Sequence, residues 1–151
     1  MNNESQIDIL NDLIAKNYDA EYGFKEAAED VESPSLKASF LEYSNQRNQF
    51  GHELKAIIKG LGGEVEKGDT IASKLHRTWM DLKSAITSNE EKNILEEVQR
   101  GENNALNHYE EALKNLDINS PAYQTVSRQC QSIRDSISKA AVKEVVYDKA
   151  Q

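Results

Sequence analysis

The sequence predicts an all-α fold, a four-helix bundle with an additional crossover helix between the second and third long helices. Apolar residues recur at alternating steps of three and four along four long segments, as in bundle helices. Only 2 prolines and 7 glycines interrupt the 151 residues, and no segment has the two-residue period of a strand. Because this length suits one core, we expect a single domain over residues 1–151.

The first two long helices form a predicted hairpin. The first covers residues 7–31, and Ser33-Pro34 begins the second, because serine caps a helix and proline suits its first turn. The glycine cluster at 60–68 ends the second helix. Their inward-facing positions are predicted to be Ile7, Leu10, Ile14, Asn17, Glu21, Phe24, Ala28 and Val31, then Leu36, Phe40, Tyr43, Arg47, Phe50, Leu54, Ile57 and Leu61.

The last two long helices form the second predicted hairpin. Ser88-x-x-Glu91 is a capping box that opens the third long helix, and Asn119-Ser120-Pro121 precedes the fourth. Their inward-facing positions are predicted to be Leu95, Val98, Glu102, Ala105, Tyr109, Ala112 and Leu116, then Tyr123, Val126, Cys130, Ile133, Ile137 and Ala140.

The two hairpins are joined by a long connection, residues 62–89. It can return along the bundle, and the shorter amphipathic helix predicted at 70–87 would then pack outside, anchored by Trp79. The joints at 33–34 and 119–121 are too short for anything but antiparallel neighbours. The alternative is an antiparallel five-helix bundle in which the 70–87 helix belongs to the core.

Composition excludes several classes of function. The net charge of −8 opposes binding to nucleic acids and to anionic membranes. The single cysteine suits a reducing compartment. The start of the chain lacks the basic and apolar regions of a signal peptide, and no run approaches about 18 apolar residues. We therefore expect a cytoplasmic protein with no nucleic-acid or membrane partner.

Four stretches carry a resemblance to a known family: EYGFKEAAED, LGGE, LHRTWMDLKSA and RGENNALNHYEEAL. With these stretches the chain resembles an uncharacterised family of bacterial four-helix-bundle proteins in the ferritin-like superfamily, over nearly its whole length. The resemblance implies a ferritin-like bundle and an ancestry in di-iron carboxylate proteins, but no known activity.

Di-iron bundles hold metal with a Glu from each of two helices and a Glu-x-x-His from each of the other two. Glu21 and Glu102 occupy two of these places. The inward pairs at the matching depth of the other helices are Arg47-x-x-Phe50 and Cys130-x-x-Ile133, which lack such ligands. The pair Gln49-x-x-His52 lies two positions beyond the inward face, so we expect it to point to solvent.

Depth along the helices predicts a buried ionic layer instead of a metal site. At about 1.5 Å per residue, Glu21, Arg47 and Glu102 all lie about 18–20 Å from one end of the bundle, and Arg134 flanks that level. Guanidinium groups can satisfy carboxylates without metal. Two alternatives remain: hydrogen bonds from Glu21 and Glu102 to tyrosines such as Tyr18 and Tyr109, or a metal site of unusual composition.

No catalytic signature is present, so we expect a non-enzymatic protein without cofactor. Its expected role is interaction or assembly, with a second copy or another protein, in stress physiology. The alternative is a metal-dependent oxidoreductase or iron-handling protein that uses Glu21 and Glu102. His76 and His108 are expected near helix surfaces, and Cys130 is expected to be an inert buried thiol.

Overall fold

The fold is all-α, as predicted. The computed structural model describes residues 2–66 and 76–150, and the side chains of residues 2–66 and 80–139. The described residues form five α-helices and no strand: α1 (Asn3–Asp30), α2 (Pro34–Gly60), α3 (His76–Ser88), α4 (Glu91–Asn115) and α5 (Pro121–Ala150). The first part of the helix expected at 70–87 and the side chain of Trp79 lie outside the described residues.

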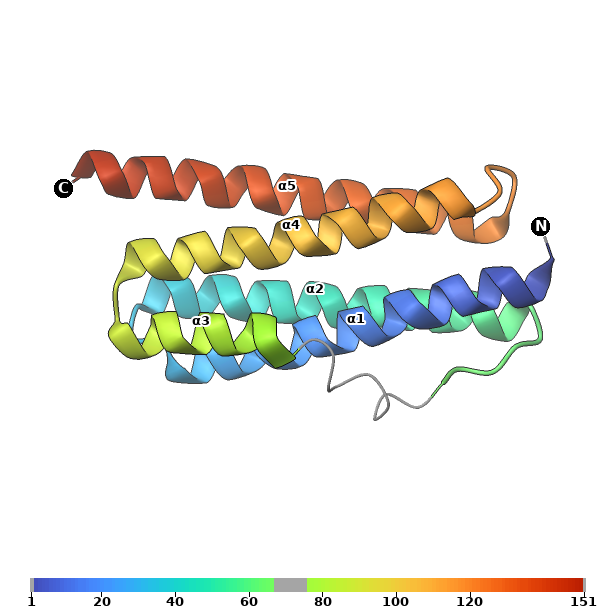
Figure 1. Ribbon diagram of the computed structural model, residues 1–151, viewed down its shortest axis with the longest axis horizontal. Coiled ribbons are helices and arrows are strands. Elements are labelled where there is room, and N and C mark those ends of the chain that lie inside the picture. Colours follow the sequence, from blue (N-terminus) through green and yellow to red (C-terminus); the bar gives the residue numbers. More distant parts are fainter. Residues whose placement is uncertain (1, 67–75, 151) are drawn as a thin grey trace.

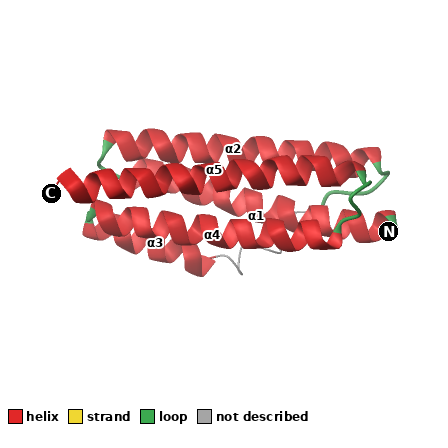
Figure 2. Ribbon diagram, turned by 90° about the horizontal axis from the view of Figure 1, so that it is seen from above, coloured by secondary structure: helices red, strands yellow, loops and turns green. Residues whose placement is uncertain are grey.

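The four long helices lie side by side, with α1 and α5 running in one direction and α2 and α4 in the other (Figure 1). Contacts join α1 to α2, α2 to α5, α5 to α4 and α4 to α1, so α2 and α4 face each other across a diagonal (Figure 2). Because α2 and α4 run the same way, the chain returns along the bundle between them. The short helix α3 packs alongside α1 and α4.

Local sequence explains how α2 begins and ends. The Oγ of Ser33 accepts a hydrogen bond from the amide of Leu36 at 3.3 Å, and Pro34 occupies the first turn, which confirms the predicted N-cap. After α2, Gly62 has a φ of 76°, a left-handed conformation that favours glycine. A Cβ on Gly63 would lie 2.5 Å from Cδ1 of Ile7, so the second glycine lets the chain pass closely over α1.

The capping box expected at the start of α4 is not formed. Glu90 is the N-cap and makes no side-chain capping bond, while Ser88 donates its hydroxyl hydrogen to the carbonyl of Ala85 at 2.8 Å. Ser88 still belongs to the last turn of α3, and Asn89 makes the sharp turn with a φ of 55°. Ser88 is therefore part of α3, and its hydroxyl does not cap α4.

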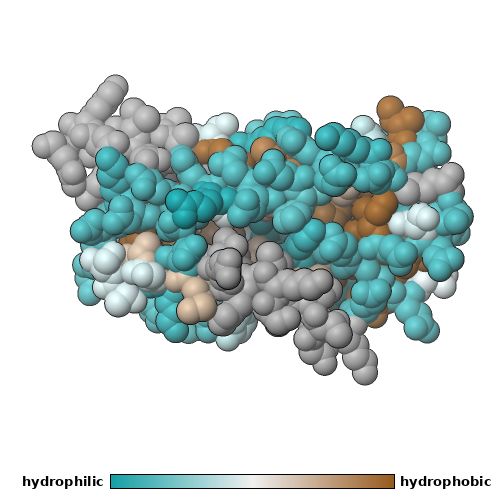
Figure 3. All heavy atoms as spheres, in the orientation of Figure 1, coloured by the Kyte–Doolittle hydropathy of each residue, from teal (hydrophilic) through white to brown (hydrophobic). Residues whose placement is uncertain are grey.

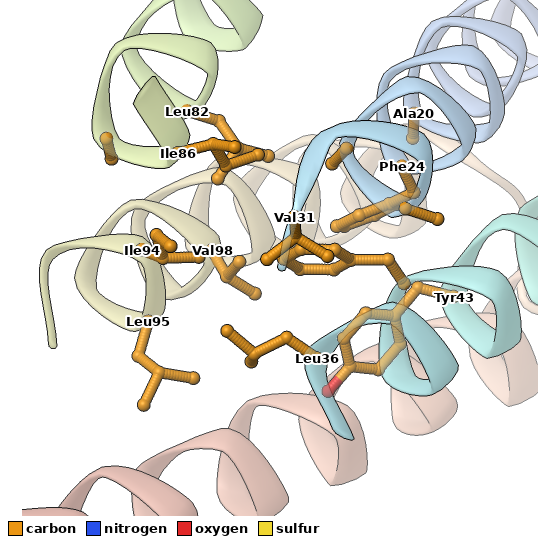
Figure 4. Close-up of a cluster of buried hydrophobic side chains, with 14 residues drawn as sticks. Ala20, Phe24, Val31, Leu36, Tyr43, Leu82, Ile86, Ile94, Leu95 and Val98 are labelled. Carbon is orange, nitrogen blue, oxygen red and sulfur yellow. The ribbon is translucent and has the colours of Figure 1, made fainter. Parts of the chain in front are cut away.

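Hydrophobic side chains of the described residues gather in two clusters, one toward each end of the bundle. In the first, Leu82 and Ile86 of α3 pack with Phe24 of α1 and with residues of α2 and α4 (Figure 4). The second cluster joins α1, α2, α4 and α5. The long helices also bring polar side chains into the interior: Asn17, Arg47 and Glu102 are buried between residues of the two clusters, and Gln129 is buried among residues of the second.

The surface is mostly hydrophilic, with hydrophobic residues showing mainly toward the end of the bundle that carries the N-terminus (Figure 3). Within the described part of the chain, no helix combines the length and the apolar character that crossing a membrane requires.

Candidate functional site

The centre of the bundle holds a buried ion pair between Arg47 of α2 and Glu102 of α4. Nη2 of Arg47 lies 2.5 Å from Oε1 of Glu102, and each side chain is 2% exposed. Nε of Arg47 donates to Oε1 of Gln46 at 3.3 Å, and the guanidinium carbon lies 5.9 Å from the centroid of the Phe24 ring. A charge-assisted bond in such an apolar setting holds both side chains in one orientation.

The second carboxylate oxygen of Glu102 is different. Oε2 is buried and accepts no hydrogen bond from the residues that the structure describes. Glu102 is one of the residues that line a cavity of about 320 Å³ between α1 and α4, together with Phe24 and Tyr109. A buried acceptor without a donor is costly, so this oxygen is the least satisfied charged atom of the ion pair.

A chain of hydrogen bonds lies next to the ion pair and connects all four long helices. Nδ2 of Asn17 donates to the hydroxyl of Tyr109 at 2.8 Å, and that hydroxyl donates to Oε1 of Gln129 at 2.6 Å. Nε2 of Gln129 in turn donates to the carbonyl of Phe50 at 3.3 Å and to Oε1 of Glu53 at 3.2 Å. Burial raises the pKa of the Tyr109 hydroxyl well above its ordinary value, so Tyr109 keeps the proton that it donates.

The structure does not bring Glu21 into contact with Arg47. Glu21 is half-buried, and its Oε2 accepts a hydrogen bond from Nδ2 of Asn48 at 3.0 Å. The inward position of this turn belongs to Ala20, which is 8% exposed. Because successive helical residues are rotated by about 100°, Glu21 lies at the side of the buried face.

The expectation for Arg134 is corrected by the structure. Arg134 lies on the surface, where its Nη2 is 3.2 Å from Oε1 of Glu110, and the two side chains are 44% and 43% exposed. Its neighbour Ile133 takes the inward position and is fully buried. The expected layer of four charged residues is therefore reduced to the pair Arg47 and Glu102.

Gln129 is one of several buried polar residues that sequence reasoning missed, and the one that joins the central hydrogen bonds. It is fully buried, next to the predicted inward residue Cys130. A usable signal exists, since Val126, Gln129 and Ile133 follow the same alternation of three and four residues. By contrast, Gln49 and His52 are exposed, as the helical spacing predicts.

Hydrogen bonding of Glu21 and Glu102 to tyrosines is not what the structure shows. Tyr18 is 37% exposed, and the ammonium of Lys55 lies 4.4 Å from the centroid of its ring. The hydroxyl of Tyr109 is bonded to amide side chains, as described above. Each carboxylate has another partner: Asn48 for Glu21 and Arg47 for Glu102.

The sequence also named one cysteine and two histidines as candidate functional groups. Cys130 is fully buried, and burial raises the pKa of its thiol. His108 is half-buried at the edge of the cavity. Burial lowers the pKa of its imidazole, and the nearby charge of Lys16 lowers it further. The side chain of His76 lies outside the described residues.

The donor set differs from that of the di-iron carboxylate proteins that the resemblance implies as ancestors. Among the residues with described side chains, no three His, Cys, Asp or Glu residues lie close enough together to hold a metal ion. Oε1 of Glu102 already accepts a hydrogen bond from the guanidinium of Arg47. A metal cation bound to Glu102 would be repelled by the positive charge of that guanidinium.

A family model described as "Domain of unknown function (DUF2383)" matches residues 5–115, a segment that reaches from the first turn of α1 to the end of α4 and includes Arg47 and Glu102. No curated protein matches the chain.

Proposed function

The chain belongs to the DUF2383 family of domains of unknown function, and from that premise we propose that it is a non-enzymatic, ferritin-like bundle without metal. In this proposal the ion pair of Arg47 and Glu102 stands where di-iron relatives bind metal. The supporting observation is the pair itself. The guanidinium of Arg47 already binds Oε1 of Glu102, an oxygen that a metal centre would need as a ligand.

The directions of the helices support the ferritin-like assignment. The long helices α2 and α4 run parallel and are separated by a connection that returns along the bundle (Figure 1). One long crossover of this kind distinguishes ferritin-like folds from bundles in which every connection is short.

One observation favours the alternative, an iron-handling protein that uses Glu21 and Glu102. Oε1 of Glu21 and Oε2 of Glu102 are both buried and without a hydrogen-bond partner among the described residues. Metal analysis of protein purified without chelators, followed by anaerobic titration with Fe²⁺ and exposure to oxygen, separates the two functions.

We expect well under one iron or manganese per chain and no near-ultraviolet band of an oxo-bridged iron pair. Stoichiometric iron with catalytic consumption of oxygen would contradict the metal-free function. Glu21→Gln is the matched variant in that case, because it removes one carboxylate and leaves the ion pair of Arg47 and Glu102 intact. Loss of iron binding in this variant would assign the site to Glu21.

The role that we propose for the bundle is interaction or assembly, with a second copy or with another protein, in the cytoplasm and in stress physiology. A reduced thiol such as that of Cys130 is stable in that compartment. Light scattering after size-exclusion chromatography, over a hundredfold range of concentration, tests self-association. A mass that stays at one chain throughout would exclude the homodimer and leave another protein as the partner.

A further inference from the structure

We infer that the buried polar side chains at the centre of the bundle form a register lock, which sets how far the α4–α5 hairpin lies along the α1–α2 hairpin. The lock consists of five buried residues that together come from all four long helices: Asn17, Arg47, Glu102, Tyr109 and Gln129. Such a lock goes beyond the proposed function, because it selects one of the ways in which the chain's own helices can pack.

The turns of the chain fix the axial offset inside each hairpin but not between the two hairpins. Residues 31–33 join α1 to α2, and residues 116–120 join α4 to α5. Connections this short hold antiparallel neighbours at one offset. The hairpins themselves are joined by residues 61–90, which include α3 and are long enough to permit several offsets. The offset between the hairpins must therefore come from contacts between them.

Apolar contacts select this offset only weakly. A slide by about 5.4 Å, one helical turn, replaces the apolar residues at a contact by others of the same apolar face. Cores tolerate such exchanges when volume and pattern are kept. The boundaries between the hairpins are also loosely packed, with a cavity of about 320 Å³ between α1 and α4 and a groove of about 240 Å³ between α2 and α5. Side chains there have room to rearrange.

The polar contacts between the hairpins do not survive such a slide. Nη2 of Arg47 lies 2.5 Å from Oε1 of Glu102, and Nδ2 of Asn17 lies 2.8 Å from the hydroxyl of Tyr109. A displacement of about 5.4 Å breaks both contacts, because hydrogen bonds extend to only about 3.2 Å. Buried polar groups and charges without partners are costly. That cost falls on every offset except the observed one.

Gln129 extends the lock to α5, since it bonds both of the helices that flank it. Its Oε1 accepts the hydrogen bond of Tyr109 from α4, and its Nε2 donates to the carbonyl of Phe50 and to Oε1 of Glu53 on α2. The amide thus uses its acceptor on one hairpin and its donor on the other. Single buried polar side chains set the register of coiled coils in the same way.

An apolar variant separates a lock from a set of bonds that only stabilise the fold. Replacement of a buried polar set by apolar residues of similar size is often neutral or stabilising, so the offset itself has to be measured. The lock-free variant carries Asn17→Leu, Arg47→Met, Glu102→Leu, Tyr109→Phe and Gln129→Met. Its matched control carries five volume-conserving exchanges in the second hydrophobic cluster: Leu10→Met, Ile14→Leu, Leu54→Met, Ile58→Leu and Ile133→Leu.

Spin labels at exposed positions, with pulsed electron paramagnetic resonance of the full chain, measure the offset. Lys37→Cys and Lys114→Cys label α2 and α4 near opposite ends of the bundle, so a slide along the axis changes their separation almost fully. Asp8→Cys with Lys37→Cys is the matched pair inside the α1–α2 hairpin. Cys130→Ala removes the native thiol in all samples. An excess of unlabelled protein keeps the measured distances within single chains.

We expect one narrow distance for both label pairs in the otherwise unmodified chain and in the apolar control. In the lock-free variant the pair across the hairpins should broaden or gain a second maximum displaced by about 5.4 Å, whereas the pair inside the hairpin should stay narrow. Thermal unfolding should show that this variant is at least as stable as the unmodified chain.

Three results would overturn the lock. The first is a single, unchanged distance across the hairpins in the lock-free variant. The second is equal broadening in the apolar control, which would make the offset a property of apolar packing. The third is a lock-free variant that does not fold, because the five residues would then be needed for stability rather than for the choice of offset.

Discussion

Arg47 and Glu102 form their 2.5 Å ion pair across the diagonal of the bundle, between helices that belong to different hairpins. The pair therefore links the α1–α2 hairpin to the α4–α5 hairpin at a single depth. Its two side chains are 2% exposed, so water cannot replace either partner.

Removal of one partner is expected to leave the other charge buried and uncompensated. Arg47→Met should lower the free energy of unfolding by roughly 3–5 kcal/mol at neutral pH. The loss should shrink in mildly acidic solution, where the stranded carboxylate of Glu102 can take up a proton. Urea denaturation at two pH values measures both effects.

Arg134→Met is the control for that experiment, since it removes an arginine from an exposed pair and should change stability little. The double variant Arg47→Met/Glu102→Leu should recover most of the loss, because an apolar replacement of both charges leaves nothing uncompensated. Additive losses in the double variant would contradict an energetic coupling between the two residues.

Tyr109→Phe should destabilise the bundle by about 1–3 kcal/mol, because it leaves buried groups of Asn17 and Gln129 without their partner. Tyr22→Phe removes the same atom from a side chain that is 65% exposed and should be nearly silent. Thermal and urea unfolding of the two variants gives the comparison. Equal small effects would show that the buried chain of hydrogen bonds adds nothing to stability.

The stability of the protein should depend on the protonation of His108. Burial and the charge of Lys16 lower the pKa of His108 below its ordinary value, while Asp12 partly opposes them. The unfolded chain then binds more protons than the folded one between the lowered pKa and about 6.5, so stability rises with pH through that window and is lost as pH falls through it.

His108→Gln should flatten this pH dependence, as measured by the midpoint of thermal unfolding at several pH values. His52→Gln is the matched control, because His52 is exposed on α2. The same slope in both variants and in the unmodified chain would show that another group causes the dependence.

Gln49→Ala and His52→Ala should each change the free energy of unfolding by less than about 0.5 kcal/mol, since both side chains point to solvent. Calorimetry of the two variants measures this. A fall of many degrees in the unfolding temperature, or loss of a bound metal, would mean that these two side chains do not face solvent and that the rotation assigned to this part of α2 is wrong.

Helical periodicity was sufficient to predict which residues of each long helix face the interior, to within one position along the chain. Arg47, Glu102 and Tyr109 are buried as their spacing predicts, and Gln49 and His52 are exposed. Ser33 and Pro34 also determined the start of α2, because capping depends only on neighbours in the sequence.

The spacing could not choose between adjacent positions. Ala20 takes the place expected for Glu21, and Gln129 and Ile133 face inward while Arg134 does not. A buried helical face is at least about 100° wide, which equals the rotation between two successive residues, so both members of such a pair are compatible with the pattern.

The sequence by itself thus determined the helices and their apolar faces, and it predicted a buried layer of four charged residues, of which only Arg47 and Glu102 form a buried pair. Only the tertiary structure decided that Arg47 meets Glu102, that Tyr109 meets Asn17 and Gln129, and that a cavity adjoins Glu102. The physical reason is that contacts between helices depend on their relative rotation and axial offset. Packing of all the long helices together sets those two quantities, whereas the period along one helix contains neither.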